Sequence, residues 1–154
     1  MMYPMRIINI VGHSNSGKTT LITRLIPELS KIARVASIKH MGHHIFTLPQ
    51  GKDTTLHFEA GACCSAGIDR DKTVLTMEGT NVFTVLDFYA YMGYDYVVIE
   101  GFKEEGFPCV VLGNLESPSA IMNNPDVEEI VRRRDEFMEY VPCRNPPQKG
   151  KVQK

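Results

Sequence analysis

The sequence has no long hydrophobic run, almost no net charge and no segment arranged like a secretion signal. No apolar run approaches the roughly 20 residues that cross a bilayer, so we expect no membrane association. The 17 Lys and Arg residues oppose 18 Asp and Glu residues, and this formal net charge of −1 argues against a nucleic-acid partner. Because the first residues lack the design of a cleavable signal, the expected location is cytoplasmic.

Paired cysteine motifs are also missing. The four cysteines stand at positions 63, 64, 109 and 143, and no two of them form a CxxC pair. A structural zinc site or a redox motif is therefore not indicated. We expect free and mostly buried thiols in a reducing compartment. A role in metal delivery would require these cysteines to lie near histidines.

What remains is the length and composition of one ordinary globular domain. The 154 residues are 43% hydrophobic and 23% charged, which is enough to bury a real core. We expect a single domain over residues 1–141. Residues 142–154 are proline-rich and then basic, so a flexible tail is expected there.

The start of the chain has the pattern of a strand, a turn, a helix and a second strand. Residues 6–11 are a β-branched run typical of a strand buried on both faces. Apolar residues in 19–29 recur at helical spacing, although Pro27 predicts a kink or an end near Ile26. With a second strand at 34–40, this βαβ unit predicts a parallel sheet with a right-handed crossover.

The rest of the chain alternates loops, helices and short strands. Residues 40–52 are polar and turn-rich, and a helix with Asp53 as its N-cap is expected over 53–62. Arginines 132–134 have acids on both sides, which indicates an exposed, salt-bridged helix face. Further helices are predicted over 81–92 and 125–140, and strands within 62–68, 72–78, 95–101 and 108–114.

Residues 12–19, GHSNSGKT, match the phosphate-binding pattern G-x-x-x-x-G-K-[ST]. The glycines let the backbone turn sharply and point several N–H groups inward, and the following helix adds its positive N-terminal dipole. Lys18 is expected to reach the β- and γ-phosphates of a nucleotide. The predicted nucleotide-binding residues are Gly12, His13, Ser14, Asn15, Ser16, Gly17, Lys18, Thr19 and Thr20. The loop in its βαβ unit predicts an α/β protein with the three-layer P-loop NTPase fold, a mainly parallel central sheet flanked by helices.

A nucleotide's Mg²⁺ needs further oxygen ligands besides the Thr19 hydroxyl. Residues 95–101, DYVVIEG, predict a strand that ends in Glu100, and strand carboxyl ends line the ligand crevice of such folds. Asp95, at the other end of this strand, is expected to be a cap or solvated. Asp53 is a second candidate acid, and a helix N-cap is its alternative role. Thr19, Glu100 and Asp53 are therefore the predicted metal ligands.

Basic side chains follow the second predicted strand. Lys39, His40, His43 and His44 are candidates for contacts to a second anionic ligand, and Lys103 is a candidate for the same role or for pairing with Glu100. The histidine spacing has no standard zinc geometry. A polar solvated loop, an anion site and a metal site all remain open for the three histidines.

Several segments beside the P-loop form an ordered combination. They are IKH at 38–40, HH at 43–44, GKDT at 51–54, AGA at 60–62 and VIEGFK at 98–103. With this combination, the chain resembles the MobB family of accessory proteins of molybdopterin-guanine dinucleotide biosynthesis. The matching motifs cover roughly the first three quarters of the chain.

The resemblance implies a GTP-binding protein, dimeric in many members, that uses Mg²⁺ and is at most a slow GTPase. It implies assistance to a molybdopterin guanylyltransferase, which forms the guanine dinucleotide form of the molybdenum or tungsten cofactor. The chain departs from the family pattern in having no carboxylate in the IFTLPQ stretch before GKD. No NKxD motif occurs either, so the GTP preference comes from the resemblance alone, with Asn114 as a candidate base contact.

Two other functions fit the phosphate loop. A small-molecule kinase would need an arginine-bearing lid and an acid aligned with an acceptor hydroxyl. The only arginine cluster, 132–134, has the pattern of an exposed helix. A metallochaperone GTPase would use the histidine and cysteine side chains and would carry a stoichiometric metal.

Overall fold

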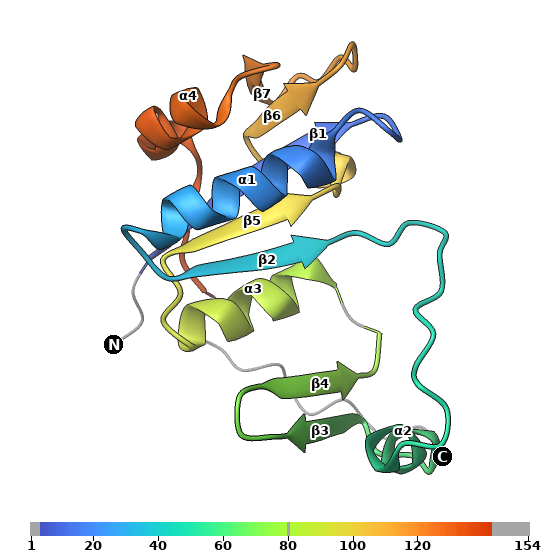
Figure 1. Cartoon of the computed structure of the whole chain (residues 1–154). Helices are drawn as coiled ribbons and strands as arrows, with labels where there is room; N and C mark the ends of the chain where they lie inside the picture. The colour runs from blue at the N-terminus through green and yellow to red at the C-terminus, as the bar shows by residue number, and fades with distance from the viewer. Residues whose placement is uncertain (1–3, 80, 143–154) are drawn as a thin grey trace. The chain divides into compact units, whose positions relative to one another are not determined.

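The computed structural model describes residues 4–79 and 81–142 (Figure 1). The predicted flexible tail, from residue 143 on, and Cys143 lie outside the described residues. The chain divides into two compact units, residues 1–40 with 83–154 and residues 41–82. The expectation of one domain over residues 1–141 stays a prediction. No helix among the described residues combines the length and apolarity needed to cross a membrane.

The first unit is built on a six-stranded sheet whose central strand is β1. Five strands run parallel in the order β2-β5-β1-β6-β7, and the short β8 pairs antiparallel with the start of β1. This confirms the predicted mainly parallel sheet. The strands are β1 (Met5–Gly12), β2 (Val35–Lys39), β5 (Tyr96–Glu100), β6 (Cys109–Leu112), β7 (Ala120–Asn123) and β8 (Glu139–Tyr140).

Helices cover both sides of this sheet. Figure 1 shows α1 (Lys18–Ser30) and α4 (Val127–Arg132) on one side and α3 (Val82–Tyr91) on the other. Ile8 and Ile10 of β1 are fully buried in the cluster that includes Leu25 and Leu29 of α1. Burial of both faces explains why β1 is apolar almost throughout, and it confirms the predicted α/β layers.

Of the two predicted effects of Pro27, a kink or an end of α1 near Ile26, the end was wrong, because the helix runs through Pro27 to Ser30. Pro27 has no N–H to donate to the carbonyl of Thr23, four residues earlier. Both residues lie on the exposed face of α1, so water can satisfy that carbonyl. The buried face, Ile22, Leu25 and Leu29, keeps its packing.

The predicted helix over 125–140 was also wrong in length. Asp126 caps α4 by accepting a hydrogen bond from the Glu129 N–H at 2.7 Å, but α4 ends at Arg132 and a short 3₁₀ turn, Arg134–Glu136, follows. Arg6 of β1 donates to the carbonyls of Asp135 and Phe137. Through Arg6, the sheet fixes the carbonyls of Asp135 and Phe137. The backbone becomes extended at Phe137 and continues into β8.

The second unit contains α2 (Asp53–Glu59) and an antiparallel hairpin of β3 (Cys64–Ile68) and β4 (Thr73–Met77). The expectation of four apolar strands was right, but these two form a sheet of their own. Asp53 is not the N-cap, because Lys52 takes that position and Asp53 begins the first turn of α2.

The two faces of the hairpin differ. On one face, Gly67 lies so close to Thr54 of α2 that an added β-carbon would be 3.1 Å from its methyl group. Ser65, on that face, is buried. Strand alternation and the β3–β4 register place the exposed residues of the other, open face together. This open face consists of Cys64, Ala66, Ile68, Thr73, Leu75 and Met77.

The thiols are less buried than predicted. Cys63 and Cys64 are free and exposed, and Cys109 is free and buried beside Val111. Hydrogen bonding to Glu78, and the charge of that carboxylate, raise the pKa of the Cys63 thiol. Burial raises the pKa of the Cys109 thiol. The prediction of mostly buried thiols therefore holds only for Cys109 among the described cysteines.

Candidate functional site

The segment between β1 and α1 is a turn with alternating backbone handedness. Asn15 and Gly17 have positive φ angles of 62° and 92°, and Ser16 between them donates its N–H to the His13 carbonyl. Such alternation points successive N–H groups toward one side and forms an anion nest. The first turn of α1 begins at Lys18, so the positive end of its dipole faces the same loop.

Gly12 closes the loop tightly. A β-carbon at this position would lie 2.5 Å from Oγ of Ser16 and 2.9 Å from the carbonyl oxygen of Leu112. The Ser16 hydroxyl is itself buried and has no hydrogen-bond partner among the described residues. A buried hydroxyl without a partner is uncommon, and a bound phosphate oxygen would satisfy it.

Lys18 folds back over the loop that precedes it. Its Nζ donates to the carbonyls of Gly12 at 2.9 Å and His13 at 2.7 Å. These two bonds hold the ammonium against the nest. The loop and Lys18 together therefore offer N–H donors and a positive charge to an anion.

Glu100 meets the start of α1 at the carboxyl end of β5. The Thr19 hydroxyl lies 3.1 Å and 3.2 Å from the two carboxylate oxygens of Glu100, although the residues are 81 positions apart in sequence. The parallel register of β1 and β5 brings both strand ends to one edge of the sheet. A hydroxyl and a carboxylate supply the oxygen ligands that Mg²⁺ prefers, so this pair fits the ion.

The salt-bridge partner of Glu100 is Lys39, which sequence reasoning had proposed only as an anion contact. Nζ of Lys39 lies 2.8 Å from Oε1 of Glu100. Lys103, the expected candidate for this pairing, is exposed in the 3₁₀ turn Lys103–Glu105. Lys39 and Glu100 each end a predicted strand, so their positions in the sequence were compatible with an ion pair. Predicting that pair would also have required knowing that β2 and β5 are neighbours.

His40 and Phe102 form a stacked pair at the same edge. Their ring centroids are 4.3 Å apart with an interplanar angle of 24°. A β-carbon on Gly101, where φ is 95°, would lie 2.9 Å from Cβ of His40. Phe102 has an unusual positive φ of 54°, and such strain tends to occur at functional sites.

The other predicted site residues belong to both units. Asp53, His43 and His44 are exposed residues of the second unit. Asn114 is exposed two residues after the end of β6. Asp95, expected to be a cap or solvated, accepts a hydrogen bond from the Arg34 N–H at 2.8 Å. Within residues 4–79 and 81–142, no group of three or more His, Cys, Asp or Glu is placed to hold a metal ion.

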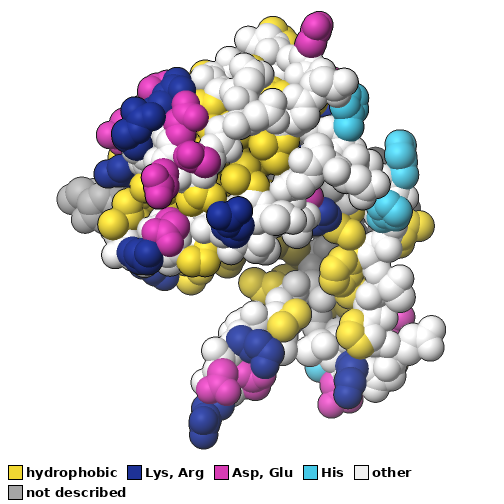
Figure 2. Space-filling model, turned by 45° about the horizontal axis from the view of Figure 1, so that its top comes forward, with side chains coloured by type: hydrophobic (Ala, Val, Ile, Leu, Met, Phe, Trp, Pro, Cys, Tyr) yellow, Lys and Arg dark blue, Asp and Glu magenta, His cyan; other side chains and the backbone are white. Residues whose placement is uncertain are grey.

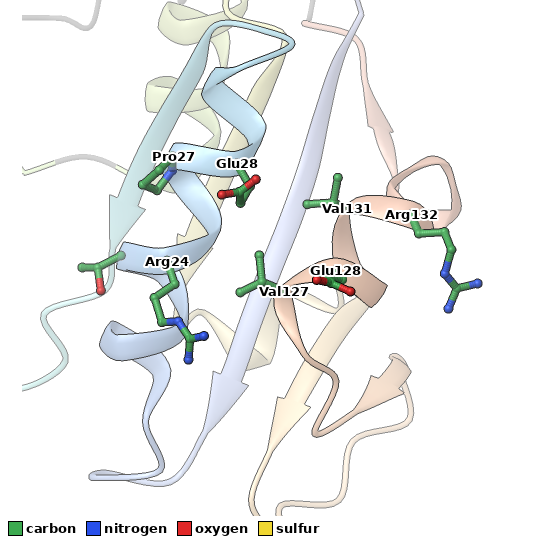
Figure 3. Close-up of a pocket in the computed structure, with 8 residues that line it drawn as sticks. Arg24, Pro27, Glu28, Val127, Glu128, Val131 and Arg132 are labelled. Atoms are coloured by element: carbon green, nitrogen blue, oxygen red, sulfur yellow. The ribbon is translucent and has the colours of Figure 1, made fainter.

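A groove of about 710 Å³ lies away from the phosphate loop, between α1 and α4. Figure 3 shows Pro27, Val127 and Val131 along it, with Glu28 and Glu128 on its two sides. None of the predicted site residues lines this groove. Ion pairs of Arg133 with Glu129 and Glu136 stabilise the same region.

The face of the molecule in Figure 2 has no continuous basic stripe, because Lys and Arg side chains alternate with Asp and Glu. Intermixed charges of this kind are typical of a solvated surface rather than of a phosphate-backbone contact.

The sequence matches the family model described as molybdopterin guanine dinucleotide synthesis protein B, MobB, over residues 7–132. A probable molybdopterin-guanine dinucleotide biosynthesis adapter protein of Bacillus subtilis is 30% identical, over 90% of this chain and 82% of the relative. A molybdopterin-guanine dinucleotide biosynthesis adapter protein of Haemophilus influenzae is 35% identical, over 81% of this chain and 71% of the relative.

Solved structures agree with the sequence relatives. The crystal structure of Bacillus subtilis MobB superposes with a TM-score of 0.64 at 28% identity and covers 77% of each chain. Together with this likeness, the mainly parallel central sheet flanked by helices is the P-loop NTPase-like fold predicted from the sequence. The resemblance found from the motifs is confirmed.

Proposed function

The chain belongs to the MobB family, and from this we propose that it is a guanine-nucleotide-binding adapter in the biosynthesis of the molybdopterin guanine dinucleotide cofactor. Family membership supports the pathway. The geometry of the phosphate loop supports the ligand, and the two arguments are independent of each other.

The observation that carries the proposal is the loop around Gly12. Its buried Ser16 hydroxyl without a partner, its alternating backbone and the Lys18 ammonium held against it form a cradle for an anion of phosphate size. Gly12 leaves no room for a side chain where that anion would approach the backbone. Thr20, exposed in the first turn of α1, is proposed as a further phosphate contact.

Thr19 and Glu100 are the residues proposed to hold Mg²⁺, which neutralises the charge of the β- and γ-phosphates when bound. Asp53 stays a proposed third ligand. The chain's own residues here bind and orient a nucleotide. Hydrolysis also needs a group that orients the attacking water. From family membership we propose at most a slow GTPase activity, consistent with an adapter.

The proposed partner is a molybdopterin guanylyltransferase, which the adapter serves by presenting bound nucleotide. The preference for GTP over ATP is proposed from family membership, with Asn114 as a candidate contact to the base. Lys39, His40, His43, His44 and Lys103 stay candidates for a second anionic ligand.

A homodimer is also proposed. The open face of the hairpin, with Ile68, Leu75 and Met77, exposes apolar side chains on a sheet of two strands. A sheet of two strands is marginal by itself in water, and a third or fourth strand or a second layer stabilises it. A second copy of the chain presents the same face and can cover it by two-fold symmetry.

Isothermal titration of the full chain with GTP and ATP, each with Mg²⁺, tests the ligand. We expect GTP to bind more tightly than ATP, and Lys18→Ala to lose at least tenfold in affinity, because it removes the charge at the nest. Lys31→Ala is the matched control, since Lys31 lies beyond the other end of α1 and pairs with Glu28.

Two results would contradict the proposal. ATP binding at least as tight as that of GTP would refute the guanine preference. Turnover near the typical kcat of about 10 s⁻¹ would indicate an enzyme of its own rather than a slow accessory GTPase.

A further inference from the structure

Lys39 and Glu100 occupy opposite positions at the ends of two neighbouring parallel strands. The register of β2 and β5 pairs Lys39 with Glu100, and their charged atoms are 2.8 Å apart. The Lys39 side chain is 55% exposed, whereas that of Glu100 is 12% exposed. The carboxylate is thus held in the protein, and the lysine is the member of the pair that can move into solvent.

Glu100 requires positive charge beside it. A carboxylate that is nearly buried is costly to leave unpaired. In the described structure its donors are the Lys39 ammonium and the Thr19 hydroxyl. Lys39 therefore neutralises the acid when no other cation is present.

Lys39 and the proposed metal site use the same atom. Oε1 of Glu100 accepts from Nζ of Lys39 at 2.8 Å and lies 3.1 Å from the Thr19 hydroxyl oxygen. A divalent cation held between Thr19 and Oε1 would lie beside the ammonium, and like charges at such a separation repel. The ammonium and the cation therefore exclude each other at this oxygen.

The position of Lys39 allows it to leave. It is the last residue of β2, which is an edge strand, and its charge sits on a flexible four-carbon stem. By contrast, the next residue, His40, is held by its stacking on Phe102 and by its N–H bond to the Glu100 carbonyl. Lys39 can leave Glu100 while the backbone at the strand end stays in place.

We propose that Lys39 is an internal counterion that competes with a divalent cation for Glu100. Occupation of Glu100 by that cation frees the Lys39 ammonium for an anion at the carboxyl edge of the sheet, so that cation and anion bind cooperatively. The inference rests on the proposed function, because the cation and anion are those of a magnesium nucleotide. Lys39 is then a positioning residue, because it acts on Glu100 before it contacts any phosphate.

The test is a titration of the full chain with Mn²⁺, followed by electron paramagnetic resonance, first without nucleotide. We expect Lys39→Met to bind Mn²⁺ about two- to fivefold more tightly than wild type, because the competing charge is gone and the stem remains. Lys39→Gln gives a second variant should the first fold poorly. Lys31→Met, which removes a lysine from an exposed pair with Glu28, should leave Mn²⁺ affinity unchanged.

A double-mutant cycle separates competition from a general charge effect. In a Glu100→Gln background, the Lys39→Met change should no longer tighten Mn²⁺ binding, because the shared carboxylate is absent. Tightening that persists in this background would overturn the proposal. Equal or weaker Mn²⁺ binding by both Lys39 variants, or none measurable, would overturn it as well.

The same titration with saturating fluorescent GTP distinguishes this inference from the proposed function. Wild-type chain that binds no guanine nucleotide, with Lys39→Met still tightening Mn²⁺, would refute the nucleotide function and support the counterion. Normal GTP binding with Mn²⁺ affinity unchanged in the Lys39 variants would support the nucleotide function and refute the role of Lys39 as a counterion.

Discussion

A β-carbon on Gly12 would lie 2.5 Å from Oγ of Ser16, closer than two such atoms approach in proteins. Gly12 is the last residue of β1, and Ser16 lies in the loop that follows it. It explains the first glycine of the phosphate loop by packing within the chain itself, since Ser16 and the Leu112 carbonyl already fill the space.

Gly12→Ala should therefore displace Ser16 and distort the nest. We expect at least a tenfold loss of GTP affinity by titration calorimetry, and a loss of about 1–3 kcal/mol in the free energy of unfolding, typical of overpacking. Gly79→Ala is the control, because a β-carbon at Gly79 meets no described atom within 4 Å. Undiminished GTP binding by Gly12→Ala would show that the loop is not the phosphate site.

Tyr140→Phe should weaken the tie between β8 and α3. The Tyr140 hydroxyl donates to the Asp87 carboxylate at 2.6 Å, and Tyr140 is buried. Loss of this bond should lower the free energy of unfolding in urea by about 1–3 kcal/mol. Tyr91, the last residue of α3, is 77% exposed, so Tyr91→Phe should change the free energy of unfolding little. An equal loss in both variants would mean that the Asp87 bond is not the cause.

The described cysteines should differ in their rate of reaction with a chromogenic disulfide reagent. The rates are measured in a Cys143→Ser background. Cys63 and Cys64 should react in the folded chain, and Cys109 only on unfolding, because burial shields it and raises its pKa. Glu78 raises the pKa of Cys63, which lowers its thiolate fraction at pH 8. With Cys64 also changed to Ser, Glu78→Gln should therefore accelerate the reaction of Cys63 at pH 8. A slower reaction would contradict the assignment.

Leu75→Glu should disrupt the proposed homodimer. Leu75 lies on the open face of the hairpin and is 44% exposed, so a carboxylate there would be buried beside its symmetry mate on dimerisation. Light scattering after size exclusion should give the monomer mass for Leu75→Glu and the dimer mass for wild type. Ile32→Glu, at 57% exposure in the first unit, should stay dimeric. Dissociation by Ile32→Glu instead would place the interface elsewhere.

Local patterns predicted the elements that carry the phosphate loop. The apolar run of β1, the loop and the helical spacing of α1 follow one another directly in sequence, so each pattern reports on its own neighbourhood. The end of α1 predicted from Pro27 was wrong, because the effect of a proline on a helix depends on which face of the helix it occupies. That face became known only from the packing of Leu25 and Leu29 against the sheet.

Partners far apart in sequence were harder to predict. The pairing of Lys39 with Glu100 depends on β2 being the neighbour of β5, and strand order is a property of the whole sheet. The early end of α4 depends on Arg6, some 130 residues before the carbonyls that it binds. In each case the local pattern was sound, and a tertiary contact decided the outcome.

The central place of β1 has a consequence for how the protein is made. β1 is synthesised before the other described strands of its sheet, yet both of its parallel neighbours, β5 and β6, lie about a hundred residues later. At synthesis rates of about 5–20 residues per second, the nascent chain waits roughly 5–20 s before its central strand can pair on either side. During translation, the apolar strand that leads into the phosphate loop thus has neither of its parallel neighbours to pair with.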